Sequence, residues 1–168
     1  MGFKQTSDIV AISFGLDESA PNTFTQEEIA LQLDVLNNEI FVVVSVDLDV
    51  ANPDSVAATD TATRASLSTT TQTGVVGMNT TNCIASAREA IRAGGFADSG
   101  VAFTRAAESV PMANLDYIAL IATNNFFVQV VGQNNLTAKD VLGRMWGYRA
   151  RADASTYAAL VQSEVLSS

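Results

Sequence analysis

The sequence predicts a mainly β protein, a single-domain antiparallel sandwich or jelly-roll barrel with one or two short helices. Three observations favour this class. Apolar and polar residues alternate in many short segments, Asn- and Gly-rich turns separate those segments, and few stretches show helical spacing. We expect about seven or eight strands, a number typical of sandwiches and jelly rolls. A chain of 168 residues is long enough to bury a core, and we expect one domain over residues 1–168.

The N-terminal part predicts a strand at residues 8–14, followed by an ambiguous segment, residues 25–36. The start of that segment has the spacing of a helical capping box, whereas residues 29–35 alternate as a strand does. A strictly alternating run at residues 40–50 follows the turn signal Asn37-Asn38. Two alternating runs around such a turn favour a hairpin over a helix.

The middle of the chain is rich in Ala, Ser and Thr. Residues 66–73 suit an edge strand because β-branched side chains occupy both faces. Residues 82–93 carry apolar side chains at helical intervals and end at Gly94-Gly95, which predicts a short helix. Residues 101–105 predict another brief strand.

The segment from 114 to 168 organises the rest, and it predicts three successive strands that form most of a sheet. Residues 117–122 are apolar on both faces, as in a central strand covered on both sides. Two further strands are expected at residues 126–131 and 141–152. Asp153 or Ser155 can then cap a final helical turn or two. The side chains that would face inward from this helix are Tyr157, Leu160 and Val161.

The charge is unevenly distributed. The net charge is −9; residues 1–60 hold eleven acids and one base, and residues 61–168 hold seven acids and eight bases, so the two parts carry −10 and +1. An acidic chain is a poor general nucleic-acid binder, because phosphate affinity comes from clustered Lys and Arg. The acidic, Lys-poor composition fits a halophilic or marine source, although GC-rich codon usage gives a similar composition.

Few residues suit catalysis. The chain has no His, and its one cysteine, Cys83, has neither a disulfide partner nor a neighbouring His base, so we expect a small buried or half-buried residue. The N-terminus does not resemble a signal peptide, and no apolar run reaches the roughly 18–20 residues that cross a bilayer. We therefore expect no enzyme activity, no cofactor and no small-molecule substrate. The apolar surplus, with a mean hydropathy of +0.20, suggests surface buried against other subunits.

One local group of carboxylates is a candidate calcium site. Asp47 and Asp49 share a strand face and Asp54 follows a turn, so their oxygens could converge on Ca²⁺. Against this, the glycine that gives a calcium loop its sharp turn is missing, and acids on the solvent face of a strand are ordinary. We expect no metal, with these three as the residues to examine.

The C-terminal part also contains a basic segment, with Lys139 among its members. One interpretation is a charge match between subunits, in which the acidic face of one copy meets the basic edge of the next. Scattered surface charge is the alternative, and polyanion contact is a third. The aromatic residues nearby could stack on a base or a sugar, or pack in a core or interface. The candidate interface residues are Phe126, Phe127, Arg144, Trp146, Tyr148, Arg149 and Arg151.

The run from Phe126 to Val130, then Asn134-Asn135, then Gly143 to Ala150 resembles virion coat proteins of the single jelly-roll kind. In size and composition the chain is similar to the major capsid proteins of haloarchaeal icosahedral viruses with an internal membrane. The resemblance implies an upright β-barrel present in many copies, with specificity in the subunit interfaces. The implied partners are copies of itself and other virion proteins, with an internal membrane nearby and no specific nucleic acid. The chain would be made in the host cytoplasm and act in the virion.

A self-assembling capsid subunit is therefore the expected function. A phage-like tail-tube or cement protein belongs to the same structural class. A β-sandwich module that binds carbohydrate or Ca²⁺ is the main alternative from another class. An enzyme ranks third and would need a deep pocket with paired carboxylates.

Overall fold

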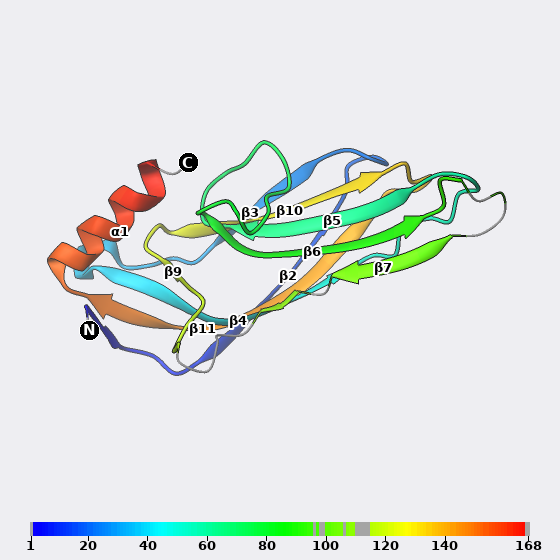
Figure 1. The fold of residues 1–168 in the computed structure, drawn as a ribbon. Helices are drawn as coiled ribbons and strands as arrows, with labels where there is room; N and C mark the ends of the chain where they lie inside the picture. The colour runs from blue at the N-terminus through cyan, green and yellow to red at the C-terminus, as the bar shows by residue number, and fades with distance from the viewer. Residues whose placement is uncertain (1, 96, 98–99, 106, 110–114, 167–168) are drawn as a thin grey trace.

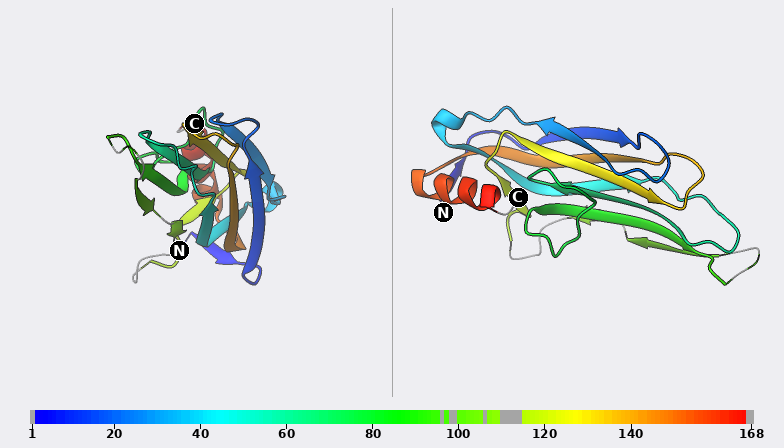
Figure 2. Two further views of the ribbon diagram at one scale, coloured as in Figure 1. Left: turned by 90° about the vertical axis from the view of Figure 1, so that its right-hand side faces the viewer. Right: turned by 90° about the horizontal axis from the view of Figure 1, so that it is seen from above.

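A computed structural model describes residues 2–95, 97, 100–105, 107–109 and 115–166. Two antiparallel sheets pack face to face, and a C-terminal helix lies at one end of the sandwich (Figure 1). The views in Figure 2 show the two layers and the helix from two other sides. The predicted class, a mainly β antiparallel sandwich with little helix, is confirmed.

Sheet A is built around the last strand of the chain. Two short N-terminal strands follow one another along one edge of this strand, β4 lies along its other edge, and two further short strands follow the far edge of β4. The strands of sheet A are β1 (Phe3–Gln5), β2 (Val10–Asp17), β4 (Glu39–Val50), β8 (Ala107–Ser109), β9 (Ala119–Ile121) and β11 (Asp140–Ala152).

Sheet B has five strands in the order β3-β10-β5-β6-β7. All four of its strand pairs are antiparallel. Its strands are β3 (Thr25–Ala30), β5 (Thr61–Ser68), β6 (Cys83–Arg92), β7 (Val101–Arg105) and β10 (Asn125–Gln133).

The strand pairs are nested along the chain. β2 pairs with β11, β3 with β10, β4 with β8 and β9, and β5 with β6. Successive pairs alternate between sheet A and sheet B, so the chain is one long antiparallel ribbon wrapped into a barrel. This wrapping is the jelly-roll topology. β1 and β7 are additions at the sheet edges. The jelly-roll form of the prediction is therefore confirmed.

The predicted hairpin around Asn37-Asn38 is wrong. Residues 25–30 do form a strand, but β3 lies in sheet B and β4 in sheet A. A 3-10 turn, η1 (Val35–Asn37), precedes β4, and Asn38 takes the left-handed conformation that ends it. Alternation shows that a segment has one buried face, but it does not specify the pairing partner.

The predicted helix at residues 82–93 is also wrong, because this segment is strand β6 between β5 and β7. Ala85 and Ala87 face the core, whereas Ser86 and Arg88 lie on the opposite, outer face. Small alanines satisfy helical spacing and period-two spacing equally well. Pairing on both edges then decides the conformation, since sheet context outweighs intrinsic propensity.

Three smaller predictions about sheet position also fail. Residues 66–68 are the end of β5, an inner strand and not an edge. β9 is short and pairs only with β4 among the described strands, so residues 117–122 are not a central strand. The three C-terminal strands do not form one sheet, because β10 lies in sheet B. The expected strands at 8–14, 101–105, 126–131 and 141–152 correspond to β2, β7, β10 and β11.

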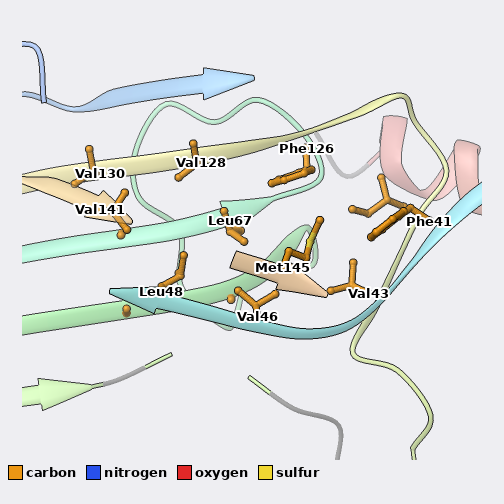
Figure 3. Close-up of a cluster of buried hydrophobic side chains, with 14 of the residues drawn as sticks. Phe41, Val43, Val46, Leu48, Leu67, Phe126, Val128, Val130, Val141 and Met145 are labelled. Carbon is orange, nitrogen blue, oxygen red and sulfur yellow. The ribbon is translucent and has the colours of Figure 1, made fainter. Parts of the chain in front are cut away.

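The main core fills the space between the sheets (Figure 3). Phe126 on β10 is fully buried and packs edge-on against Phe14 of β2, with ring centroids 5.8 Å apart. Such a pair combines a large buried apolar area with a favourable ring geometry. The other core side chains labelled in Figure 3 are Phe41, Val43, Val46, Leu48, Leu67, Val128, Val130, Val141 and Met145.

A bulge in β4 divides its apolar residues between two clusters. The register with β11 shifts beside Val44, so Val46 and Leu48 face the main core while Ile40 and Val42 face the outer side of sheet A. The strict alternation of the sequence suggested that all of these residues share one face. An extra residue at a bulge reverses the facing of everything beyond it.

Helix α1 (Ala154–Leu166) covers Ile40 and Val42 on this outer face. Tyr157, Leu160 and Val161 pack against the cluster, as predicted. Asp153 caps the helix by accepting a hydrogen bond from the Thr156 amide, at 2.8 Å. The helix is longer than the expected turn or two. Within the described residues, no helix combines the length and hydropathy needed to span a bilayer.

A buried carboxyl group holds α1 to β9. Glu164 is 6% exposed, and its Oε1 accepts a hydrogen bond from the Ala122 amide at 2.8 Å. Its Oε2 has no hydrogen-bond partner among the residues that the structure describes. Burial raises the pKa of Glu164, although the Ala122 amide opposes the shift by stabilising the charged form. The ionised group therefore weakens the docking of the helix.

Ile121→Asp should unfold the protein. The Ile121 side chain is fully buried in the main core, so a carboxylate there would cost about 4 kcal/mol or more. Leu142→Asp is the matched control, because Leu142 on β11 is 54% exposed and the change should cost no more than about 0.5 kcal/mol. Circular dichroism and urea unfolding measure both. A soluble, folded Ile121→Asp protein would contradict this packing.

Glu164→Gln should stabilise the protein at neutral pH and have little effect in acid. Folding raises the pKa of Glu164 above its ordinary value of 4.5. The contribution of Glu164 to the free energy of unfolding is therefore most favourable below pH 4.5, and it is lost as the pH rises through the pKa of the folded state. Glutamine keeps the acceptor for Ala122 without the charge. Urea unfolding across this pH range measures the difference, with exposed Glu27→Gln as the control. A destabilisation independent of pH would contradict the assignment.

Candidate interaction surfaces and the polar loop cluster

The part of sheet A that α1 leaves uncovered presents a shallow groove. The Arg144 guanidinium lies 5.9 Å from the centroid of the Trp146 ring, and its Nε donates to Ser13 Oγ at 3.2 Å. Asp47 is the register partner of Arg144 on β4, and Asp49 is that of Leu142. The structure thus brings two predicted interface residues, Arg144 and Trp146, together with two of the predicted calcium ligands on one exposed face.

The other predicted interface residues have different surroundings. Arg149 makes contacts within the chain, because its Nη1 binds Glu39 Oε1 at 2.9 Å and its Nη2 donates to the Leu31 carbonyl at 2.6 Å.

The remaining predicted interface residues lie in several places. Tyr148 is half-buried in the α1 cluster, and this burial raises its pKa. Arg151 is exposed at the end of β11. Phe126 is buried in the core, and Phe127 lies half-buried on the outer face of sheet B.

Asp54 does not join Asp47 and Asp49, the other two residues of the candidate calcium site. Both Asp54 oxygens are already used: Oδ1 binds Lys139 Nζ at 2.6 Å, and Oδ2 accepts the Leu136 amide at 2.8 Å. Within the part of the chain that the structure describes, no three His, Cys, Asp or Glu side chains form a group that could hold a metal ion.

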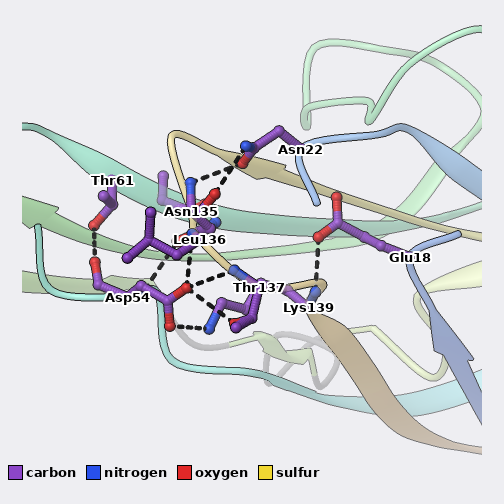
Figure 4. A network of polar contacts seen from close by, with 9 residues as sticks. Glu18, Asn22, Asp54, Thr61, Asn135, Leu136, Thr137 and Lys139 are labelled. Carbon is purple, nitrogen blue, oxygen red and sulfur yellow. Dashed lines mark hydrogen bonds and ion pairs between the residues drawn. The ribbon is translucent and has the colours of Figure 1, made fainter. Parts of the chain in front are cut away.

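Asp54 belongs instead to a polar loop cluster at the end of the sandwich opposite α1 (Figure 4). Its Oδ2 also accepts the amide and the hydroxyl of Thr137, both at 2.9 Å. The Lys139 side chain is only 9% exposed, so the ion pair is largely shielded from water. The Lys139 ammonium, with the Thr137 and Leu136 donors, holds the pKa of Asp54 well below its usual range.

Two more residues of the cluster join loops that are distant in sequence. Glu18 is buried and accepts the amides of Thr23, Gly132 and Lys139, at 2.9, 2.8 and 2.8 Å. Asn135 Oδ1 accepts the Asp54 amide at 2.9 Å, and its Nδ2 donates to the Ala62 carbonyl at 2.9 Å. The β2–β3, β4–β5 and β10–β11 loops are therefore fastened together.

Asn22 completes the cluster by exchanging two hydrogen bonds with the Asn135 backbone, at 2.8 and 3.0 Å. Every polar contact of these side chains serves loop structure, so the cluster is a structural element. The sequence showed Asn135 only as a turn residue. The one available signal was an isolated lysine, Lys139, in an Asn-rich segment of a Lys-poor chain.

Part of the outer face of sheet B is covered by residues 69–82. Gln129 on β10 is fully buried; its Nε2 donates to Gln26 Oε1 at 2.8 Å and to Ser68 Oγ at 2.7 Å. The covering segment binds this row of polar side chains, Gln26, Gln129 and Ser68, through the Gln72 amide, which donates to Gln26 Oε1 at 2.9 Å. A fully paired polar row under a loop adds order to that end of the face.

The rest of this face carries arginines that sequence reasoning missed. Arg64 on β5 and Arg88 on β6 are register partners, and both are exposed. Arg105 occupies the register position beside Arg88 on β7. Arg92 lies farther along β6, with its Nε 3.3 Å from Asp60 Oδ2. The wrong prediction of a helix at residues 82–93 hid this row of arginines, because they align only across paired strands.

Cys83 is half-buried at the start of β6, as expected. Burial raises the pKa of its thiol, although a backbone hydrogen bond with Ala85 acts the other way. At neutral pH the group is therefore a protonated thiol, which is a weak nucleophile.

Asp54→Asn should lower the free energy of unfolding by about 3 kcal/mol, because it leaves the shielded Lys139 ammonium without a counter-charge. The loss should become smaller in acid. Because folding lowers the pKa of Asp54, its carboxylate stabilises the folded state fully above its ordinary pKa of 3.8. This stabilisation is lost as the pH falls through the lower pKa of the folded state. Urea unfolding from neutral to acid pH measures both effects.

The exposed pair Arg92–Asp60 provides the control for this measurement. Its side chains are 68% and 43% exposed, so Arg92→Ala should cost less than about 1 kcal/mol. Equal losses in the two variants would show that the Asp54–Lys139 pair has no special role in the loop cluster.

No protein-family model matches the chain. No curated protein matches it either. Among solved structures, the chain is similar to one from Desmodium yellow mottle tymovirus, with 8% sequence identity and a TM-score of 0.31, over 88% of this chain and 91% of that chain. The strand pairing within this chain is itself that of a jelly roll.

Proposed function

We propose that this chain is a structural subunit that assembles with copies of itself into a viral capsid. The observation that carries the proposal is the nested strand pairing, since jelly rolls of two sheets build viral capsid domains. Lectin and cupin domains share this architecture. The chain has no His for a cupin-type metal site.

Exposed apolar side chains support an assembling subunit. Phe103 and Val101 on β7 are 54% and 50% exposed, and β7 pairs only with β6 among the described strands. Ile9 and Val10, at the start of edge strand β2, are also exposed. Open edges that carry apolar side chains tend to pair with other chains. Burial against neighbouring copies would account for the positive mean hydropathy of an acidic chain.

A non-enzymatic role is part of the proposal. The titratable groups that the fold gathers most closely, Glu18, Asp54 and Lys139, are committed to hydrogen bonds between loops. The half-buried Cys83 thiol has a raised pKa, and the chain contains no His that could act as its base. These groups stabilise the barrel and offer no acid–base pair to a substrate.

The finer form of the proposal follows the resemblance to haloarchaeal coat proteins. The chain would act in the virion, beside other virion proteins and an internal membrane. Its acidity and its few lysines support this assignment, since exposed carboxylates keep a protein hydrated in concentrated salt. A tail-tube or cement subunit is the related alternative, and the shape of the assembled particles distinguishes them.

A second candidate function is carbohydrate binding on the open face of sheet A. The observation that favours it is one shallow groove that contains half-buried Trp146 with exposed Arg144, Asp47 and Asp49. A ring that stacks on a sugar, with carboxylates that accept hydrogen bonds from its hydroxyl groups, is a common sugar-binding arrangement. Arg144 and Trp146 also remain the best placed of the predicted interface residues.

Light scattering of the purified chain at low and high salt tests the proposal. We expect discrete large oligomers or closed particles whose mass depends on salt, because charged surfaces contribute to contacts between copies. Electron microscopy of the same samples separates shells from tubes. A monomer under every condition would contradict the capsid function. Binding to glycans on an array that is lost in the Trp146→Ala variant would favour the second candidate.

A further inference from the structure

We propose that the arginines on the outer face of sheet B bind the carboxylates on the outer face of sheet A in a second copy of this chain. The inference rests on the proposed self-assembly and identifies the surfaces that meet. The basic patch consists of Arg64, Arg88 and Arg92, with Arg105 at the next register position. The acidic face consists of Asp17, Asp47, Asp49 and Asp140.

The basic patch is a row of like charges. Arg64 and Arg88 lie directly opposite each other on adjacent strands, and Arg105 is the register partner of Arg88 on the third. Like charges in register destabilise a sheet, so an isolated barrel gains nothing from this row. Arg64 and Arg88 have no ion pair or hydrogen bond among the described residues. With Arg92 they line one shallow groove, which leaves their guanidinium groups open to a ligand.

Arg92 is only partly neutralised. Its partner Asp60 also accepts the amides of Ala93 and Gly94, each at 2.8 Å, and these bonds help to lower the pKa of that carboxyl group. The pair is well exposed, and pairs of this kind contribute little to stability. The patch therefore keeps a positive charge on a chain whose net charge is −9.

The acidic face shows the opposite charge in the same kind of arrangement. Asp17 on β2 and Asp140 on β11 are register partners, so two carboxylates lie opposite each other. Asp47 and Asp49 project from the same side of β4 and are exposed. None of the four has an ion pair or side-chain hydrogen bond among the described residues. The one arginine within this face, Arg144, is held by Ser13 and Trp146.

The two surfaces fit a head-to-tail contact between copies. They lie on the outer faces of opposite sheets, so a copy can use its basic patch toward one neighbour and its acidic face toward another. Such a contact joins different surfaces of two identical chains and repeats through an assembly. Each guanidinium matches a carboxylate in a paired hydrogen-bond geometry. Nucleic acid is a weaker partner, because the acidic remainder of the chain repels a polyanion.

Charge-reversal variants test the pairing directly. Arg88→Glu places an acid in the basic patch, and Asp47→Arg places a base in the acidic face. Each variant alone should need an at least about tenfold higher concentration to assemble, measured by light scattering at low salt. Lys4→Glu is the matched control, since Lys4 is exposed on β1 outside both surfaces and should assemble as wild type does. Circular dichroism checks that each variant is folded.

An equimolar mixture of the Arg88→Glu and Asp47→Arg variants is the decisive measurement. In an alternating assembly the introduced glutamate of one chain would meet the introduced arginine of the other, while the remaining contacts keep their original residues. Assembly should therefore return to near the wild-type concentration. Rescue by mixing supports the proposal, because a folding defect in either variant cannot be repaired in this way. Failure of both variants without rescue overturns it.

Two further outcomes separate this inference from the capsid proposal. If wild type assembles and Arg88→Glu assembles equally well, the pairing is wrong while the capsid function stands. If wild type is monomeric in all conditions, both are wrong. A single-stranded oligonucleotide provides the last comparison: tight binding that Arg88→Glu abolishes, with assembly unchanged, would assign the basic patch to phosphate and overturn the pairing between copies.

Discussion

The close approach of β11 to its neighbours is the constraint on which the rest of the barrel depends. β11 lies between β2 and β4, and it does so through two glycines that leave room for aromatic rings. A methyl group at Gly143 would overlap the Phe14 ring, and one at Gly147 would overlap the Phe41 ring and the Val42 carbonyl. Phe14 packs on Phe126 across the core, so Gly143 leaves room for a ring that joins the two sheets. The bulge in β4 lies beside Gly147, and it divides the strand between the core and α1.

The sequence predicted what depends on local pattern. The strand type of most segments, the turn role of Asn38 and the cap at Asp153 follow from periodicity and side-chain chemistry. The pairing partners could not be predicted, because residues 29–35 and 40–50 alternate in the same way, yet β3 and β4 belong to different sheets. The polar loop cluster was missed for the same reason: Asn22 and Asn135 are 113 residues apart, and single residues far apart in sequence leave no spacing to detect.

The distribution of charge along the chain could be predicted from the sequence, but the exposure and pairing of individual charges could not. The acidic start and more basic remainder of the chain are visible in the sequence. The fold, however, neutralises Lys139 and Arg149 by pairing them with Asp54 and Glu39. It leaves open the arginines of β5 and β6, which the sequence did not single out. Which charges are available to a partner is therefore decided by strand register and burial rather than by composition.

The nested ribbon also has a consequence for how the chain is made. The innermost pair, β5 and β6, can close as soon as residues 61–92 have left the ribosome, whereas the outermost pair waits for β11. Contacts between distant segments carry a larger entropic cost and form slowly. The outer surface of sheet A combines residues from β2, β4 and β11, so it does not exist until the last strand has been synthesised. Nascent chains thus lack one of the two surfaces that a growing assembly would use. Association between copies would therefore follow the completion of folding.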